Sequence, residues 1–193
     1  MALILRAADR SSAPWKNGGG LTREVAVHPA DSDFGNFDWR VSLAEVRRGG
    51  AFSSFAGVDR HMAVISGRLG LSISGREPLS LASGSPPLTF PGEVAVYAEP
   101  GTEPVTDLNV MTRRGRFLAR LTRCSAAESP ELRLEADTTL LLALVPLTLR
   151  APSIEATLAA LDAARFSASA QTLSVHAAAP GAAAFWVIDI RAA

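Results

Sequence analysis

Short runs of alternating apolar and polar residues recur along the first two-thirds of this chain of 193 residues. The clearest run is residues 37–43, Phe-Asp-Trp-Arg-Val-Ser-Leu, in which every second side chain is apolar. Because successive side chains of a strand point to opposite faces, this pattern predicts strands with one buried face. Further runs occupy residues 21–27, 62–65, 69–73, 93–97, 105–112 and 117–121. Glycine and proline separate the runs, which is typical of an all-β sandwich or jelly-roll barrel.

The last third of the chain predicts a second and simpler half of the same kind. Residues 140–149 and 185–190 have the pattern of strands, whereas residues 153–166 begin with a serine N-cap and contain strong helix formers. The sequence does not decide whether residues 153–166 form a helix or strands. The order of the segments resembles that of the first half, so we expect two stacked barrel halves. The first barrel, over residues 1–120, would hold the ligand site, and a degenerate half over residues 121–193 would pack on it.

Charge and hydropathy exclude several classes of partner. Lysine and arginine together number 19, as do aspartate and glutamate, so the chain lacks the net positive charge that attracts nucleic acid. The longest apolar stretch, residues 140–149, is about half the length of a membrane span. Residues 1–10 have too short an apolar run for a signal peptide. We therefore expect a cytoplasmic protein whose partners include neither nucleic acid nor a membrane. The sequence does not decide whether the protein forms a homodimer.

Metal and redox chemistry are disfavoured by the spacing of the ligand residues. The three histidines, His28, His61 and His176, form neither an H-x-H nor an H-x-x-x-H pair. The single cysteine, Cys124, has no partner for an internal disulfide or a C-x-x-C motif. We therefore expect neither a metal nor another cofactor.

Polar and conformationally special residues concentrate in four segments, residues 14–24, 38–42, 52–61 and 107–114. The first contains three successive glycines, which let the backbone approach a ligand closely, and the only lysine of the chain. In the fourth, strand alternation puts Asp107, Asn109 and Met111 on one face. Each segment also has a plain structural interpretation, such as a connecting turn, a solvated strand face or an ion pair at a strand end.

Taken together, five motifs resemble the HutD/Ves family. They are Pro-Trp-Lys-Asn-Gly-Gly-Gly-x-Thr-Arg-Glu at residues 14–24, Phe-Asp-Trp-Arg-Val-Ser at 37–42, Phe-Ser-x-Phe-x-Gly-x-Asp-Arg at 52–60, Phe-Pro-Gly at 90–92 and Asp-Leu-Asn-Val-Met at 107–111. The match covers about residues 1–120 and departs from the family at Ala56, where the family usually has proline. The resemblance implies a bicupin, a double-stranded β-helix without the usual metal-binding histidines. It also implies a link to histidine utilisation, with formylated or urocanate-like small acids as ligands.

The main hypothesis is a small-molecule binding protein that regulates or buffers histidine utilisation. Its arginine and lysine side chains would bind the acid, and its asparagine and aspartate side chains would recognise an amide or imidazole N–H. The expected contacts to this anionic ligand are Lys16, Asn17, Thr22, Arg23, Arg40, Arg60, His61, Asp107 and Asn109.

Two alternatives belong to other functional classes. One is a metal-independent cupin enzyme, an isomerase or hydrolase, in which His61 is the general base and Asp59 or Asp107 orients it. The other is a protein-interaction module, which requires an exposed apolar patch that alternation alone does not locate.

Overall fold

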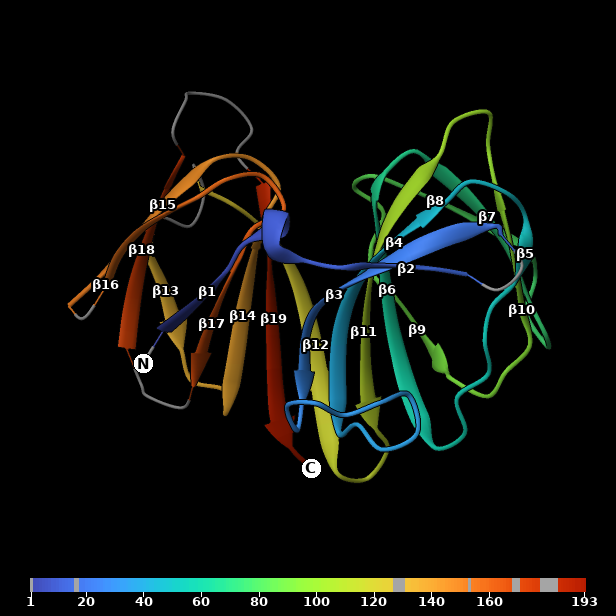
Figure 1. Ribbon diagram of the computed structural model, residues 1–193, viewed down its shortest axis with the longest axis horizontal. Coiled ribbons are helices and arrows are strands. Elements are labelled where there is room, and N and C mark those ends of the chain that lie inside the picture. Colours follow the sequence, from blue (N-terminus) through green and yellow to red (C-terminus); the bar gives the residue numbers. More distant parts are fainter. Residues whose placement is uncertain (1, 16–17, 127–130, 153, 168–170, 178–183) are drawn as a thin grey trace. The chain divides into compact units, whose positions relative to one another are not determined.

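A computed structural model describes residues 2–15, 18–126, 131–152, 154–167, 171–177 and 184–193 (Figure 1). Its described residues are almost entirely strands, and their one helix is a short 3-10 turn at Ala7–Asp9. The all-β prediction is therefore confirmed. No helix among the described residues is long and apolar enough to cross a membrane. The chain divides into two compact units, which we call the cavity unit, residues 11–117, and the second unit, residues 1–10 with 118–193.

The cavity unit consists of a six-stranded and a four-stranded sheet. The six-stranded sheet has the order β2-β3-β4-β11-β6-β9, with β2 Ser12–Pro14, β3 Gly20–His28, β4 Trp39–Val46, β11 Val105–Arg113, β6 Val58–Ser66 and β9 Leu88–Pro91. The four-stranded sheet has the order β5-β10-β7-β8, with β5 Gly50–Ala51, β10 Val96–Pro100, β7 Arg68–Ile73 and β8 Leu79–Ala82. One core joins the two sheets, because Met62 and Val64 of β6 pack with Leu69, Leu71 and Ile73 of β7. Their alternate spacing is the pattern that predicted the strands.

The second unit has the same two-sheet construction. Its five-stranded sheet has the order β1-β17-β14-β19-β12, with β1 Ala2–Leu5, β17 Ala163–Ser167, β14 Thr138–Ala143, β19 Ala184–Ala192 and β12 Phe117–Ser125. Its four-stranded sheet has the order β13-β18-β15-β16, with β13 Glu131–Leu134, β18 Gln171–Ala177, β15 Leu147–Ala151 and β16 Ile154–Leu158. Leu141, Leu149, Phe166, Leu173 and Phe185 are among the apolar residues between the sheets.

The first ten residues belong to this second unit, whereas the sequence analysis predicts them as part of the first barrel. Strand β1 pairs antiparallel with β17, with Ala2 opposite Phe166. The buried carboxylate of Asp162 accepts hydrogen bonds from the backbone N–H of Ala7 at 2.7 Å and from the Arg6 guanidinium at 2.8 Å. Because this pairing joins residues about 160 positions apart, no local pattern in the sequence indicates it.

The segment for which a helix was considered forms two strands. Residues 154–158 are β16 and residues 163–167 are β17, with a turn between them; Ser153 lies outside the described residues. In β16 the less exposed residues are Ile154, Ala156 and Leu158, a period of two that suits a strand. Pairing with β15 supplies the backbone hydrogen bonds, so tertiary context overrides the local helix propensity.

Candidate ligand-binding cavity

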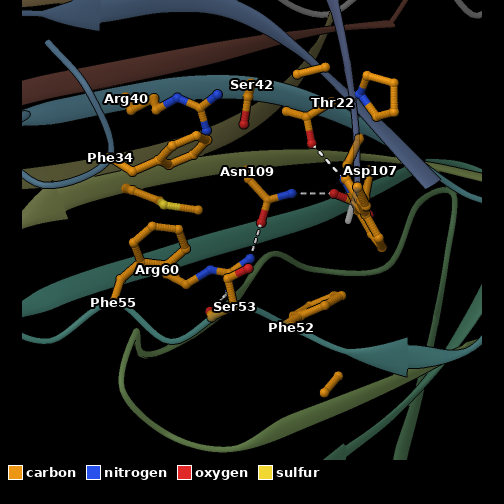
Figure 2. A pocket seen from close by; sticks show the side chains of 16 residues that line it. Thr22, Phe34, Arg40, Ser42, Phe52, Ser53, Phe55, Arg60, Asp107 and Asn109 are labelled. Atoms are coloured by element: carbon orange, nitrogen blue, oxygen red, sulfur yellow. Dashed lines mark hydrogen bonds between the residues drawn. The ribbon is translucent and has the colours of Figure 1, made fainter. Parts of the chain in front are cut away.

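The cavity unit contains a cavity of about 530 Å³, lined by residues from β2, β3, β4, β5, β6, β11 and the loops beside them (Figure 2). Its polar lining includes Thr22, Arg40, Ser42, Arg60, Asp107 and Asn109. Aromatic rings, among them Trp15, Phe34, Phe52 and Phe55, form much of the remaining wall. A small number of polar groups within an apolar enclosure is the usual composition of a small-molecule site.

Strand register brings the polar residues together. Met111 of β11 lies opposite Arg40 of β4 on one side and Arg60 of β6 on the other. Two residues along β11, Asn109 lies opposite Ser42. Because every second residue of a strand points to the same face, these side chains all face the cavity.

Arg60 is buried at the cavity wall and stays charged. Its side chain donates from Nη2 to Oδ1 of Asn109 at 2.8 Å and from Nη1 to the Ser53 carbonyl at 3.4 Å. The guanidinium carbon lies 4.9 Å from the ring centre of Phe52 and 5.2 Å from that of Phe90. Burial lowers the pKa of Arg60 to about 10, while the nearby carboxylate of Asp107 opposes the shift. The side chain is therefore a cation at neutral pH.

Asp107 is a fully buried carboxyl group at the cavity. Its Oδ1 accepts a hydrogen bond from Nδ2 of Asn109. Its Oδ2 has no hydrogen-bond partner among the described residues. Burial raises the pKa of Asp107 from 3.8 to about 7, although the charge of Arg60 and the bond from Asn109 favour the ionised form. This group therefore titrates near neutrality.

Arg40 is the second buried arginine of the cavity. Its Nε donates to Oε2 of Glu24 at 2.8 Å, and its guanidinium carbon lies 4.6 Å from the ring centre of Phe34. Phe34 itself is 58% exposed. The loop that carries it is held by Arg113, whose Nη2 donates to the Gly35 carbonyl at 3.1 Å. The ring is thus held at the rim of the cavity.

Thr22, Arg40, Arg60, Asp107 and Asn109, which the sequence predicted as ligand contacts, lie together on this cavity. The predicted contacts Lys16 and Asn17 lie outside the described residues.

The structure does not bring the remaining predicted residues to the cavity, because each is displaced by one position from a residue that faces it. Arg23 follows Thr22 and pairs with Glu45 at 3.6 Å. His61 follows Arg60, and its Nδ1 lies 2.9 Å from Oγ1 of Thr89. Burial lowers the pKa of His61, against the opposing charge of Asp59.

Asp59, the other candidate catalytic residue, is also outside the cavity lining. Its carboxylate accepts from Nε of Arg114 at 2.7 Å, and Arg114 also pairs with Glu93 at 2.7 Å. This exposed network is consistent with a structural ion pair at a strand end.

The aromatic part of the site was only partly visible in the sequence. The sequence indicates residues 52–55 as a candidate segment because aromatic and polar residues are mixed there. It does not indicate Phe34, because Phe34 lies in a polar connection between two strands. Its signal was a single large apolar residue between Asp33 and Gly35. Among the described residues, no group of three or more His, Cys, Asp or Glu side chains is arranged to hold a metal ion.

The family model named HutD matches residues 7–185 of the chain. The chain belongs to the HutD family. The resemblance inferred from the five motifs is therefore confirmed, and the match extends through most of the second unit of this HutD-family protein.

Two curated relatives match the HutD-family chain over part of its length. An uncharacterized 21.2 kDa protein from the hutC 3′ region of Pseudomonas putida is 34% identical over 119 residues, which are 61% of this chain and 62% of the relative. Protein Ves of Cronobacter sakazakii is 34% identical over 108 residues, 55% of this chain and 58% of that protein. The chain thus spans about three-fifths of the length of the curated relatives it matches.

Solved structures match the whole HutD-family chain. A conserved protein of unknown function from Pseudomonas aeruginosa PAO1 has a TM-score of 0.88 at 29% identity, covering 99% of both chains. HutD from Pseudomonas fluorescens SBW25, in a formate condition, has a TM-score of 0.82 at 28% identity and covers 100% of both. A cupin 2 conserved barrel domain protein from Leptotrichia buccalis has a TM-score of 0.58 at 10% identity, covering 95% of this chain and 92% of that one. The last comparison concerns the fold alone, and it agrees with the predicted cupin-like architecture.

Proposed function

We propose that this HutD-family protein binds a small anionic molecule, a carboxylate or formamide of urocanate-like size, and thereby regulates or buffers histidine utilisation. The observation that carries the proposal is the pair of buried arginines, Arg40 and Arg60, which face the same cavity with 7% and 5% of their surface exposed. Burying a cation costs free energy unless an anion compensates it. A bound carboxylate supplies that compensation and accepts hydrogen bonds from the guanidinium groups.

The charge balance of the cavity supports an anion rather than a cation. Arg40 has the carboxylate of Glu24 as a partner. Arg60 has no salt bridge among the described residues, and the nearby Asp107 carries only part of a negative charge near neutral pH because its pKa is about 7. A ligand carboxylate gives Arg60 the directly contacting anion that the described residues do not supply, since Asn109 lies between Arg60 and Asp107. Its volume of about 530 Å³ suits a small organic acid.

The comparisons support the biological context of the proposal. The chain belongs to the HutD family, and HutD of P. fluorescens matches it over its full length. The position of His61 favours binding over a reaction in which His61 is the catalytic base, because His61 does not line the cavity.

Replacing Arg60 with methionine is expected to weaken the binding of urocanate and formylglutamate by roughly 1.5–3 kcal/mol, the usual value for a hydrogen bond to a charged group. Methionine keeps most of the apolar volume of the arginine side chain. When the positive charge of Arg60 is lost, Asp107 can bind a proton, so the variant does not retain an unpaired buried charge there. Arg40→Met is expected to have an effect of similar size. Isothermal titration calorimetry against both acids measures these changes.

The matched control for these variants is Arg150→Met, which removes an exposed arginine of the second unit, where the Arg150 and Glu155 side chains are 62% and 69% exposed. Its affinity for both acids is expected to equal that of the wild type. From the sequence alone, Lys16→Ala is expected to weaken binding by a similar amount to Arg60→Met. Equal affinities in the wild type and the two cavity arginine variants would refute the proposed function.

Replacing His61 with asparagine is expected to change the affinity for urocanate less than about twofold, because His61 does not line the cavity. NMR spectra of urocanate and formylglutamate incubated with the wild-type protein are expected to show no new species. A product that forms with the wild type and is lost in the variant would instead establish the alternative of a metal-independent enzyme with His61 as its base.

A further inference from the structure

The cavity carries opposite polarity at its two ends. Strand register places Arg40 and Arg60 on either side of Met111, at one end. At the other end, Asp107 and Thr22 both lie opposite Ala44. Positions 107 and 111 are four residues apart on β11, which corresponds to about 13 Å along the strand. The side chains of Arg60 and Asp107 both hydrogen-bond the amide of Asn109, so a ligand much shorter than this backbone spacing can reach both groups.

Asn109 connects the two ends and determines how Asp107 is oriented. Its Oδ1 accepts from Arg60, so its Nδ2 must be the atom that donates to Oδ1 of Asp107. Figure 2 shows this amide between the two charged side chains, with both hydrogen bonds drawn. The second carboxyl oxygen, Oδ2, is left buried at the cavity, without a hydrogen-bond partner among the described residues.

An unpartnered buried acceptor is costly, and native proteins rarely keep one without a reason. Thr22, the neighbouring hydroxyl group, accepts a hydrogen bond from Nε1 of Trp15 at 2.8 Å. The guanidinium groups of Arg40 and Arg60 are donors, and Oδ2 of Asp107 at the opposite end is an acceptor without a partner among the described residues. A ligand that matches both ends therefore has an acceptor, such as a carboxylate, at the arginine end and a donor at the Asp107 end.

We propose that the ligand is an acid with an N–H group at the end remote from its carboxylate, and that Asp107 is the residue that selects this N–H. The carboxylate binds Arg40 and Arg60, and the N–H donates to Oδ2 of Asp107. The inference rests on the proposed function, since it names the chemical class of ligand for the same cavity.

This binding mode is coupled to a proton. The charged groups that face Asp107 across the cavity are Arg60 of β6 and Arg40 of β4, with Glu24 of β3 behind Arg40. From the opposing four-stranded sheet, β7, β8 and β10 contribute apolar side chains to the core. Near pH 7 Asp107 is partly protonated. Because Oδ1 accepts from Asn109, the proton belongs on Oδ2, and an N–H donor at Oδ2 favours the ionised form. An acid with this N–H is therefore expected to release more protons on binding at pH 7 than a matched acid without it, because the carboxylate, which opposes ionisation of Asp107, is common to both.

The test compares two acids that differ in one ring atom, 3-(pyrrol-3-yl)acrylate and 3-(furan-3-yl)acrylate, in which this atom is not bonded to the carbon that carries the acrylate. The pyrrole ring has an N–H and the furan ring has an oxygen in its place, and neither ring titrates near pH 7. Calorimetry of the wild-type protein is expected to show roughly ten- to hundredfold tighter binding of the pyrrole acid. In two buffers of different ionisation enthalpy, the pyrrole acid is expected to release more protons than the furan acid.

The second part of the test measures the binding of both acids to the Asp107→Asn variant. Because Asn109 still presents its Nδ2, the new amide must turn its oxygen to Asn109 and its own N–H₂ to the cavity. The preference for the pyrrole acid is therefore expected to disappear, and the difference in proton release with it. Equal affinities of the two acids for the wild type, or a pyrrole preference that survives in the variant, would overturn the inference. Failure of both acids to bind the wild type would instead refute the proposed function.

Discussion

The Asp107→Asn variant is expected to lose a pH dependence of stability that the wild-type protein shows. Between pH 4 and pH 8, the free energy of unfolding of the wild type should fall by about 4 kcal/mol relative to that of the variant. Burial raises the pKa of the Asp107 carboxyl group from 3.8 to about 7. Over the interval between these values the folded protein binds a proton that the unfolded chain releases. Each pH unit there lowers the stability by about 1.4 kcal/mol.

Urea denaturation of both proteins at several pH values measures this difference. Other titrating groups, including His61 with its lowered pKa, are present in both proteins and cancel in the comparison. The control is Glu155→Gln, which removes an exposed carboxylate and is expected to keep the pH profile of the wild type. A stability difference between wild type and Asp107→Asn that stays constant from pH 4 to pH 8 would contradict a carboxyl group that is neutral in the folded protein below neutrality.

Replacing Phe90 with alanine is expected to lower the free energy of unfolding by roughly 3–5 kcal/mol. Phe90 is 1% exposed and belongs to the core between the two sheets of the cavity unit. Its ring centre also lies 5.2 Å from the guanidinium carbon of Arg60, so the loss of the ring opens space beside the cavity. A void that the surrounding side chains fill only partly is the physical cause of the expected cost.

Phe34→Ala is the matched control for Phe90→Ala, because it removes the same side chain from a position that is 58% exposed. Its effect on the free energy of unfolding is expected to stay within about 0.5 kcal/mol. Urea denaturation of the two variants and the wild type at one pH measures both effects. Similar losses in the two variants would mean that Phe90 does not contribute the buried core contacts seen in the structure.

Residues 105–112 illustrate how much of the site was predictable. Their alternation predicted a strand with Asp107, Asn109 and Met111 on one face, and the structure has these three residues on β11 facing the cavity. The same alternation puts Arg60 and His61 on opposite faces of β6, but it does not say which face is the inner one. That choice depends on the sheet that packs against β6, here through Leu69 and Leu71 of β7. The sequence therefore predicted both residues as ligand contacts, but only Arg60 lines the cavity.

The sequence by itself determined the all-β class, the family, and the strand faces that collect polar residues, because these follow from local alternation and short motifs. Only the tertiary structure decided which faces meet. The hydrogen bond from Arg60 to Asn109 joins residues 49 positions apart, and the bond from Arg40 to Glu24 joins β4 to β3. Both depend on antiparallel register, in which a shift of one residue turns every side chain of a strand to the other face. Register is set by the packing of complete sheets, so a cavity built from several paired strands cannot be derived from any one of them.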